Sequence, residues 1–304
     1  MTAFQVTRPG EVGGATVTVR DLEESVAAYG AFLGMSCLRR EAVEEELATY
    51  WRSPATAGRP SALLLPRSGA EVPLRLVELP EALEGFRPLS TFGWAALEIN
   101  VEDADSLARK LADSPFRILG PPKELEFTDR IYPMQVVGPS GEVLYLNEVR
   151  GPLPDFDLPV ARSFVDRIFI VVLAVPHLEE ALAFYERVLG YGRGNEYEIP
   201  YSVINQAFSF PADRRHKLAM ACVGRRVNVE VDQYPAETVE RRAFRDLLPG
   251  GIASVALAVE SLAQAPRGLL GPVHRWPEPP YHGRPSAVCR GTAGELVELV
   301  EVGP

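Results

Sequence analysis

A fifteen-residue segment near the start of the chain nearly recurs 156 residues later. DLEESVAAYGAFLGM, Asp21 to Met35, and HLEEALAFYERVLGY, His177 to Tyr191, are identical at seven of fifteen positions. Each copy follows an apolar run typical of a strand, ATVTV at 15–19 and IFIVVLAV at 168–175. The first copy has apolar residues at helical spacing and a glycine that ends the pattern, Gly34. Such a repeat indicates a chain built from duplicated strand-helix units.

Further strands are predicted after each helix, so each unit has the order β-α-β-β-β. A second unit in each half opens with a strand and a helix, WAALEINVEDADSLARKLAD at 94–113 and GIASVALAVESLAQA at 251–265. The two closing strands, 141–149 and 294–302, share five of nine residues. A proline-rich segment, 151–163, separates the halves. The sequence therefore predicts an N-terminal domain, 1–150, and a C-terminal domain, 164–304, of two modules each.

Amino-acid composition indicates which kinds of binding partner this chain is expected to have. The formal net charge is −10 without a basic patch, so neither nucleic acid nor an anionic membrane surface is an expected partner. No apolar run is long enough for a transmembrane helix, and the first residues lack the apolar core of a signal peptide. The three cysteines are too scattered for a disulfide framework. We expect a cytoplasmic protein, monomer or homodimer, whose partner is a small molecule.

The repeated strand-D-L-E motif, its Tyr and Leu-Gly, and the closing G-E strand together resemble the vicinal-oxygen-chelate superfamily. That superfamily includes glyoxalase I, bleomycin-resistance proteins and extradiol dioxygenases. The resemblance covers nearly the whole chain and implies an α+β fold of two tandem domains. Their four βαβββ modules would form two open, cup-shaped sheets with helices outside, and the inner faces would hold a divalent metal and a small ligand.

The residues at the family's metal-ligand positions differ from the family pattern. The expected histidines fall at Gly14 and Ile170 in the opening strands, with Arg167 as an alternative to Ile170, and at Ala96 and Ser254 in the second modules. The expected glutamates fall at four other positions: Tyr145, Glu298, Arg75 and Glu230. No histidine remains, so we expect the metal site to be lost and predict no cofactor. If a divalent ion binds, Glu230 and Glu298 would hold it.

Strand alternation predicts which side chains face each cup. The N-terminal cup would contain Arg75, Glu98, Asn100 and Tyr145. In one interpretation, Arg75 and Glu98 are a buried structural ion pair. In the other, Arg75 and Asn100 bind a substrate while Tyr145 or Glu98 moves a proton.

The C-terminal cup would have apolar walls on which Glu230, Glu298 and Ser254 converge. Carboxyl groups in an apolar cup have raised pKa values, which suits general acid–base catalysis. The alternative is that both are relics held by hydrogen bonds. Tyr281 and His282, in a loop rich in proline and aromatic residues, are candidates for ligand contact.

We therefore predict a protein that acts on a small oxygenated or aromatic molecule by proton transfer, as an isomerase or lyase, through Glu298, Glu230, Tyr145 and Glu98. One alternative is a metal-independent binding or resistance protein. The other is a metal-dependent extradiol-type dioxygenase, which would need a histidine pair facing a glutamate. The carboxylates favour the enzyme.

Overall fold

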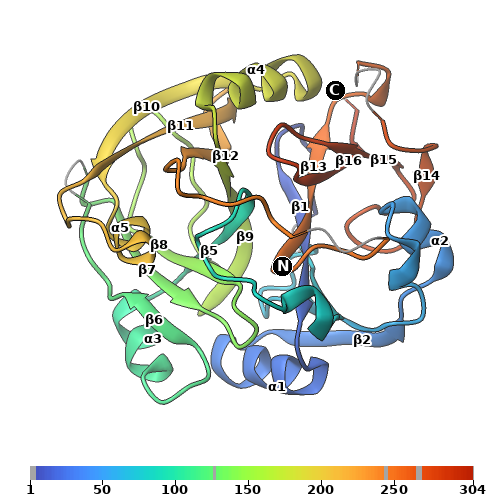
Figure 1. Ribbon diagram of the computed structural model, residues 1–304, viewed down its shortest axis with the longest axis horizontal. Coiled ribbons are helices and arrows are strands. Elements are labelled where there is room, and N and C mark those ends of the chain that lie inside the picture. The colour runs from blue at the N-terminus through green and yellow to red at the C-terminus, as the bar shows by residue number, and fades with distance from the viewer. Residues whose placement is uncertain (1–4, 126–127, 243–245, 265–268, 304) are drawn as a thin grey trace.

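The four predicted modules are present in a computed structural model, which describes residues 5–125, 128–242, 246–264 and 269–303. Figure 1 shows two sheets side by side, with helices on their outer surfaces. Neither sheet closes into a barrel; each curls into an open cup. No helix within the described ranges is long and apolar enough to cross a membrane.

The first half of the chain holds modules 1 and 2. Module 1 consists of β1 (Val12–Val19), α1 (Leu22–Leu33), β2 (Ser36–Ala42), α2 (Glu45–Tyr50), the 3-10 helix η1 (Pro54–Thr56), β3 (Pro60–Leu65), β4 (Leu74–Glu78) and η2 (Pro80–Leu83). Module 2 consists of β5 (Gly93–Val101), α3 (Ala104–Leu111), β6 (Arg117–Gly120), β7 (Ile131–Val137) and β8 (Val143–Val149).

The second half holds modules 3 and 4. Module 3 consists of β9 (Val165–Val175), α4 (Leu178–Leu189), β10 (Gly192–Pro200), α5 (Ser202–Phe208), β11 (Arg215–Val223) and β12 (Arg226–Gln233). Module 4 consists of β13 (Ile252–Val259), η3 (Leu262–Gln264), β14 (His274–Arg275), β15 (Pro285–Arg290) and β16 (Leu296–Glu301). Within the described part of module 4, the short 3-10 helix η3 follows the opening strand where the other modules have an α-helix.

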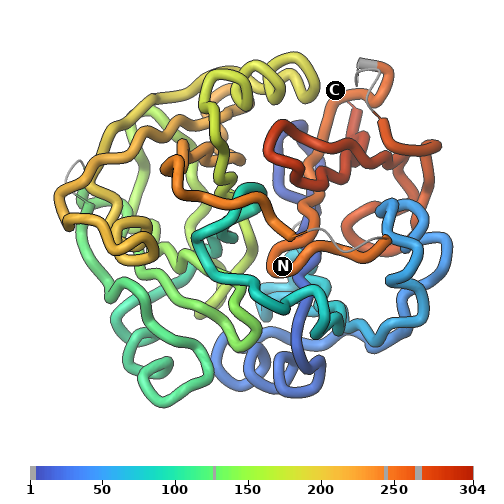
Figure 2. Tube along the Cα trace, in the orientation of Figure 1, coloured from blue at the N-terminus to red at the C-terminus, as the bar shows by residue number. Residues whose placement is uncertain are grey.

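Each eight-stranded sheet combines modules from both halves. Sheet I joins modules 4 and 1 in the order β14-β15-β16-β13-β1-β4-β3-β2, and sheet II joins modules 3 and 2 in the order β10-β11-β12-β9-β5-β8-β7-β6. In Figure 2 the blue N-terminal strand β1 accordingly lies beside the orange C-terminal strand β13. The central pairs, β1 with β13 and β5 with β9, are antiparallel.

This pairing overturns the expectation that each half of the chain forms its own cup. Arg75 on β4 lies in sheet I, whereas Glu98 on β5 and Tyr145 on β8 lie in sheet II. Likewise Glu230 on β12 and Glu298 on β16 lie in different sheets. Strand alternation predicts which face of a sheet a side chain lies on. Which module pairs with which through its opening strand depends on tertiary packing.

Two buried hydrogen bonds explain why the helix motif and the closing G-E segment both recur in the sequence. Tyr29 of the first motif donates to Glu142 at 2.8 Å, and Tyr185 of the second donates to Glu295 at 3.1 Å. Both glutamates belong to the closing G-E segments, and their carboxylates also accept backbone N–H groups of the preceding turns. The first bond joins α1, which follows a strand of sheet I, to the turn before β8 of sheet II. The second joins α4, which follows a strand of sheet II, to the turn before β16 of sheet I. The repeated residues therefore tie the two sheets together.

The same motif also fixes the two helix ends. Asp21 caps α1 by accepting the backbone N–H of Glu24 at 2.8 Å. Gly34 and Gly190 end α1 and α4 in the left-handed conformation, both with φ 68°. His177 takes the capping position of α4 without a capping hydrogen bond from its side chain.

Candidate functional site

The cup of sheet I is filled by its own side chains. Helix α2 and the loop before β15 place Tyr50, Trp51 and Tyr281 inside it, against Ala256 and Val288, and all five are buried. At the family's ligand positions the remaining space is about 10 Å³, which is at the lower limit for one water molecule. This cup has no room for an organic ligand.

Glu298 and Arg75, at two of the ligand positions of sheet I, have partners within the same cup. Glu298 accepts hydrogen bonds from the hydroxyls of Ser254 and Tyr281. Arg75 is 6% exposed, pairs with Glu41 at 2.8 Å and lies 5.9 Å from the centre of the Trp51 ring. The expected Arg75–Glu98 pair is therefore wrong, because a carboxylate of strand β2 takes this role.

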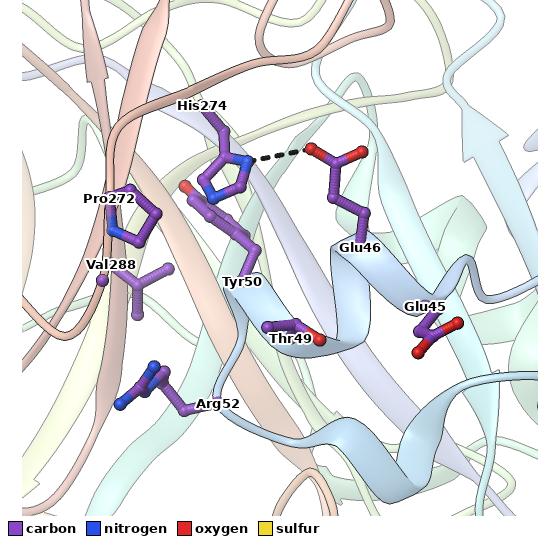
Figure 3. Close-up of a pocket in the computed structure, with 9 residues that line it drawn as sticks. Glu45, Glu46, Thr49, Tyr50, Arg52, Pro272, His274 and Val288 are labelled. Carbon is purple, nitrogen blue, oxygen red and sulfur yellow. Dashed lines mark hydrogen bonds and ion pairs between the residues drawn. The ribbon is translucent and has the colours of Figure 1, made fainter.

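A surface depression of about 470 Å³ lies outside this filled cup, between α2 and β14 (Figure 3). Tyr50 forms part of its wall, and His274 Nδ1 lies 3.2 Å from Glu46 Oε1 across its rim. His274 stacks on Trp276 with ring centres 5.4 Å apart. Glu298 is not among the described residues that line this depression.

The cup of sheet II, by contrast, contains a cavity of about 530 Å³. Its floor comes from β5, β8 and β12, its walls from β7, β9, β10 and β11, and part of its rim from the linker between the sequence halves. Most of the wall is apolar, including Ile131, Phe156, Leu158, Ile170, Ile199, Leu218, Met220 and Val227. Its size and composition are those of a site for a small organic ligand.

Four acidic side chains line the described part of this cavity: Asp129 and Asp155 are exposed, whereas Glu98 and Glu230 come from the floor, in opposite modules. Glu98 is 6% exposed and accepts a hydrogen bond from the amide of Asn147. Glu230 is partly exposed and accepts the hydroxyl of Tyr201 at 3.0 Å. Among the described lining residues, the one basic side chain is Arg130, which lies beside Asp129 at 3.4 Å. The two carboxyls thus face a largely apolar space.

This environment raises the pKa of both groups. Burial, and then the negative charge of Glu230, raise the pKa of Glu98 well above its usual value. Burial raises the pKa of Glu230. Asp232, which is 1% exposed and two residues along β12, has its pKa raised by burial and by Glu230. Such a cluster holds protons at a pH where exposed carboxylates have lost theirs.

Tyrosines complete the polar floor. Tyr145 is buried in the cavity wall, with its ring centre 6.4 Å from that of Tyr201. Burial raises the pKa of Tyr145 and of Tyr201 well above the usual value, so near neutral pH both hydroxyls are hydrogen-bond donors rather than bases.

Strand register and cavity lining show which second-module residues lie beside the opening strands. Glu98 pairs with Ile170 across the sheet II centre, and Ala256 pairs with Gly14 across the sheet I centre. Glu98 and Ala256 line the spaces of the two cups, whereas Ala96 and Ser254, two residues earlier on the same strands, are not among the described lining residues. Ile170 lines the cavity, whereas Arg167 does not.

The four ligand positions in sheet II are thus Ile170, Glu98, Tyr145 and Glu230. These residues do not fit the three or four ligands with histidine that zinc or iron takes in such sites. Within the described part of the chain, no three His, Cys, Asp or Glu side chains are grouped so that they could hold a metal ion. The expected convergence of Glu230 with Glu298 and Ser254 is wrong, because they lie in different sheets.

The remaining predicted residues lie outside the cavity. Asn100 is fully buried and donates to the carbonyl of Pro159 at 3.2 Å, so it holds the linker. Tyr281 belongs to the filled cup, and His282 lies 3.4 Å from Glu71. Sequence reasoning missed Asn147 and Asp232, although alternation from Tyr145 and Glu230 would have found them. Tyr201, in the turn before α5, carries no sequence signal.

Comparisons with known proteins agree with this architecture. Residues 167–269 match the family model described as Glyoxalase/Bleomycin resistance protein/Dioxygenase superfamily. Glyoxalase I from Zea mays is 17% identical, with a TM-score of 0.61 over 96% of this chain and 92% of that one. A single-residue variant of the Zea mays protein has a TM-score of 0.64 over 97% of this chain and 94% of that one. A dioxygenase-like protein from Bacillus subtilis is 12% identical, with a TM-score of 0.63 over 98% and 87%. A comparison with curated protein sequences finds no match.

At these identities the solved structures show the fold alone, and the family match is confined to residues 167–269. The chain has a tandem, two-cup fold like that of glyoxalase I from Zea mays, and within it residues 167–269 are similar to the glyoxalase/bleomycin resistance protein/dioxygenase superfamily.

Proposed function

We propose that the cavity of sheet II binds a small, largely apolar molecule that carries a carbonyl group, and that Glu98 and Glu230 move a proton beside that carbonyl. The observation that carries the proposal is that two carboxyl groups from opposite modules face one apolar cavity. The reaction class is that of an isomerase or a lyase.

The two carboxyls suit this chemistry because they interact. When one of them is ionised, its charge favours the protonated form of the other. The ionised group can accept a proton from the carbon next to the carbonyl. A protonated group, or the hydroxyl of Tyr201, can donate a hydrogen bond to the carbonyl oxygen as an enol forms. Return of the proton to a different carbon gives isomerisation, and loss of a leaving group from the enol gives elimination.

The proposal needs no metal ion, and the described residues do not provide a ligand set for one. It also moves the catalytic role away from Glu298, which is enclosed in the filled cup. Glu230 and Glu98 keep the roles proposed from the sequence, whereas Tyr145 would donate a hydrogen bond instead of moving a proton. Arg75, Ser254 and Tyr281 belong to the structure of sheet I.

Proton exchange in D₂O tests the proposal even when the product of the reaction is unidentified. The protein is incubated with a panel of small ketones, aldehydes and hydroxyketones, and NMR follows loss of the proton signal next to the carbonyl. We expect exchange with at least one compound, slowed by about 10²-fold or more in Glu98→Gln and Glu230→Gln. Glu298→Gln, a buried glutamate of the filled cup, is the matched control and should keep the wild-type rate. Exchange that survives both cavity variants would contradict the proposal.

The second candidate is a protein that binds and sequesters its ligand. The apolar cavity wall favours this function. A compound that raises the melting temperature but shows no enzyme-dependent exchange would support it over the enzyme.

A further inference from the structure

A second cavity, of about 680 Å³, lies on the other side of the linker from the cavity of sheet II. It is formed by residues 5–12, by linker residues 157–159 and by parts of β9 and β12. The two cavities share Leu158 and Val227 as lining residues, so these side chains belong to the partition between them. We call this second space the arginine cavity.

Its charged groups are three arginines and two acids: Arg8, Arg167, Arg226, Glu11 and Asp157. Three arginines in one cavity stand out in a chain whose net charge is −10.

The two acids of the arginine cavity already have partners. Glu11 Oε2 accepts the backbone N–H groups of Thr7 and Arg8, at 2.9 and 3.1 Å. Asp157 Oδ1 accepts Arg225 Nε at 2.9 Å. Neither carboxylate is within 4.0 Å of the Arg226 guanidinium among the described ion pairs.

The guanidinium group of Arg226 has an N–H donor without an acceptor among the described residues. Its Nη2 reaches the carbonyl of Pro9 at 3.4 Å, and its buried Nε has no hydrogen-bond partner among the described residues. Arg167 Nη1 lies 4.0 Å from Asp166, whose carboxylate also accepts the hydroxyl of Ser68 and the backbone N–H of Arg162. Desolvation lowers the pKa of Arg167, and the negative charges of Asp166 and Glu11 act against this shift. A buried guanidinium donor without an acceptor is unfavourable, and a bidentate oxyanion satisfies it best.

An unpaired acceptor lies beside these donors. Asn228 is 4% exposed, and its Oδ1 is buried without a hydrogen-bond partner among the described residues. An oxygen in this position accepts an O–H or N–H group of a ligand.

We infer that the arginine cavity binds a small organic anion, a carboxylate that also carries a hydroxyl group, with its charge on Arg226 and its hydroxyl on Asn228. The site is distinct from the cavity of sheet II and independent of the reaction proposed there.

Isothermal titration calorimetry with a matched pair of probes tests this inference. Malate and succinate differ by one hydroxyl group, and inorganic phosphate reports whether any oxyanion suffices. We expect malate to bind more tightly than succinate. Asn228→Ala should remove that preference. Arg226→Gln should weaken malate binding by about tenfold or more, as expected for a charge-assisted hydrogen bond.

Two further variants keep the test decisive. Arg226→Lys keeps the positive charge but loses the paired, planar N–H donors of the guanidinium group, so this variant should bind malate with intermediate affinity. Arg117→Gln removes an exposed arginine of β6, outside the arginine cavity, and should leave binding unchanged. Absence of heat with all three anions would overturn the inference, as would equal malate binding by wild type and Arg226→Gln. Tighter binding of phosphate than of malate would overturn the assignment to a hydroxycarboxylate.

Discussion

At the scale of single residues, a carboxyl group's surroundings decide its role more than its place in a family motif does. In the sequence, Glu298 and Glu230 are equally good candidates for site residues, because both occupy positions where relatives carry metal ligands. The structure separates them: hydroxyls enclose Glu298, whereas Glu230 faces an open cavity. Strand alternation could predict that both point into a cup. It could not predict that Trp51 and Tyr50 fill one cup, because that depends on the volume of side chains brought in by α2.

The glutamates of the repeated turns give a pH-dependent prediction. Burial raises the pKa of Glu142 and of Glu295 to about 7. A carboxyl whose folded pKa is raised stabilises the fold fully below its unfolded pKa, and this contribution is lost as pH rises through the folded value. Each group should therefore lower the unfolding free energy by roughly 2–3 kcal/mol between pH 5 and pH 8, since one pKa unit corresponds to about 1.4 kcal/mol.

Urea denaturation at pH 5 and pH 8 measures this effect. Glu142→Gln and Glu295→Gln keep a hydrogen-bond acceptor but cannot ionise, so each should reduce the stability difference between the two pH values. An unchanged difference in both variants would show that these groups do not titrate in this range.

At the scale of elements, the repeated motif predicts helix positions and ends well. The helix after β1 and the helix after β9 have matching bounds, both end at a left-handed glycine, and the sequence predicted both stops. The strand register was harder to predict. Glu98, the cross-strand partner of Ile170, lines the cavity, whereas Ala96, the position expected from the motif, pairs with Val172 and is not among the described lining residues.

Two glycines of α1 give opposite predictions for the same substitution. Gly34→Ala should lower the unfolding free energy by about 1–2 kcal/mol, because alanine is strained at its φ of 68°. Gly30 lies inside the helix, and a methyl group there would meet Met35 O at 3.6 Å, an ordinary contact. Gly30→Ala should therefore raise stability by about 0.5–1 kcal/mol. Chemical denaturation of both variants checks the pair, and the same sign for both would contradict the helix end.

The linker gives a third prediction at this scale. Arg225 donates to Asp157 at 2.9 Å and to the carbonyls of Pro154 and Leu153 at 2.7 and 3.1 Å. Arg225→Ala should speed cleavage of the linker in limited proteolysis, with little change in melting temperature because the side chain is half exposed. Arg290→Ala, another exposed arginine, serves as the control. Equal cleavage rates in the two variants would mean that the linker is held by other contacts, such as Asn100.

At the scale of the whole molecule, the two halves of the sequence are not the two halves of the fold. The repeat could predict four modules and their inner faces. It could not predict that module 1 pairs with module 4, because every module presents a similar central strand. The consequence is functional: the cavity combines Glu98 from the first half of the chain with Glu230 from the second.

Separating the halves tests this arrangement. Residues 1–150 alone would leave β1 and β5 without their central partners, and an unpaired central edge promotes association. We expect either half, expressed alone, to aggregate or self-associate. Co-expression of 1–150 with 164–304 should restore a one-to-one complex by size-exclusion chromatography. A stable, folded monomer of either half would contradict the observed pairing.

The central claim is that Glu98 and Glu230 hold a proton in the cavity near neutral pH. Infrared difference spectroscopy across a pH titration measures protonated carboxyl groups directly. The account predicts a protonated-carboxyl signal near pH 7 in the wild-type protein, to which Glu142 and Glu295 also contribute, and which diminishes in Glu98→Gln and in Glu230→Gln. An unchanged signal in both variants, or full ionisation of both cavity groups by pH 5, would contradict it.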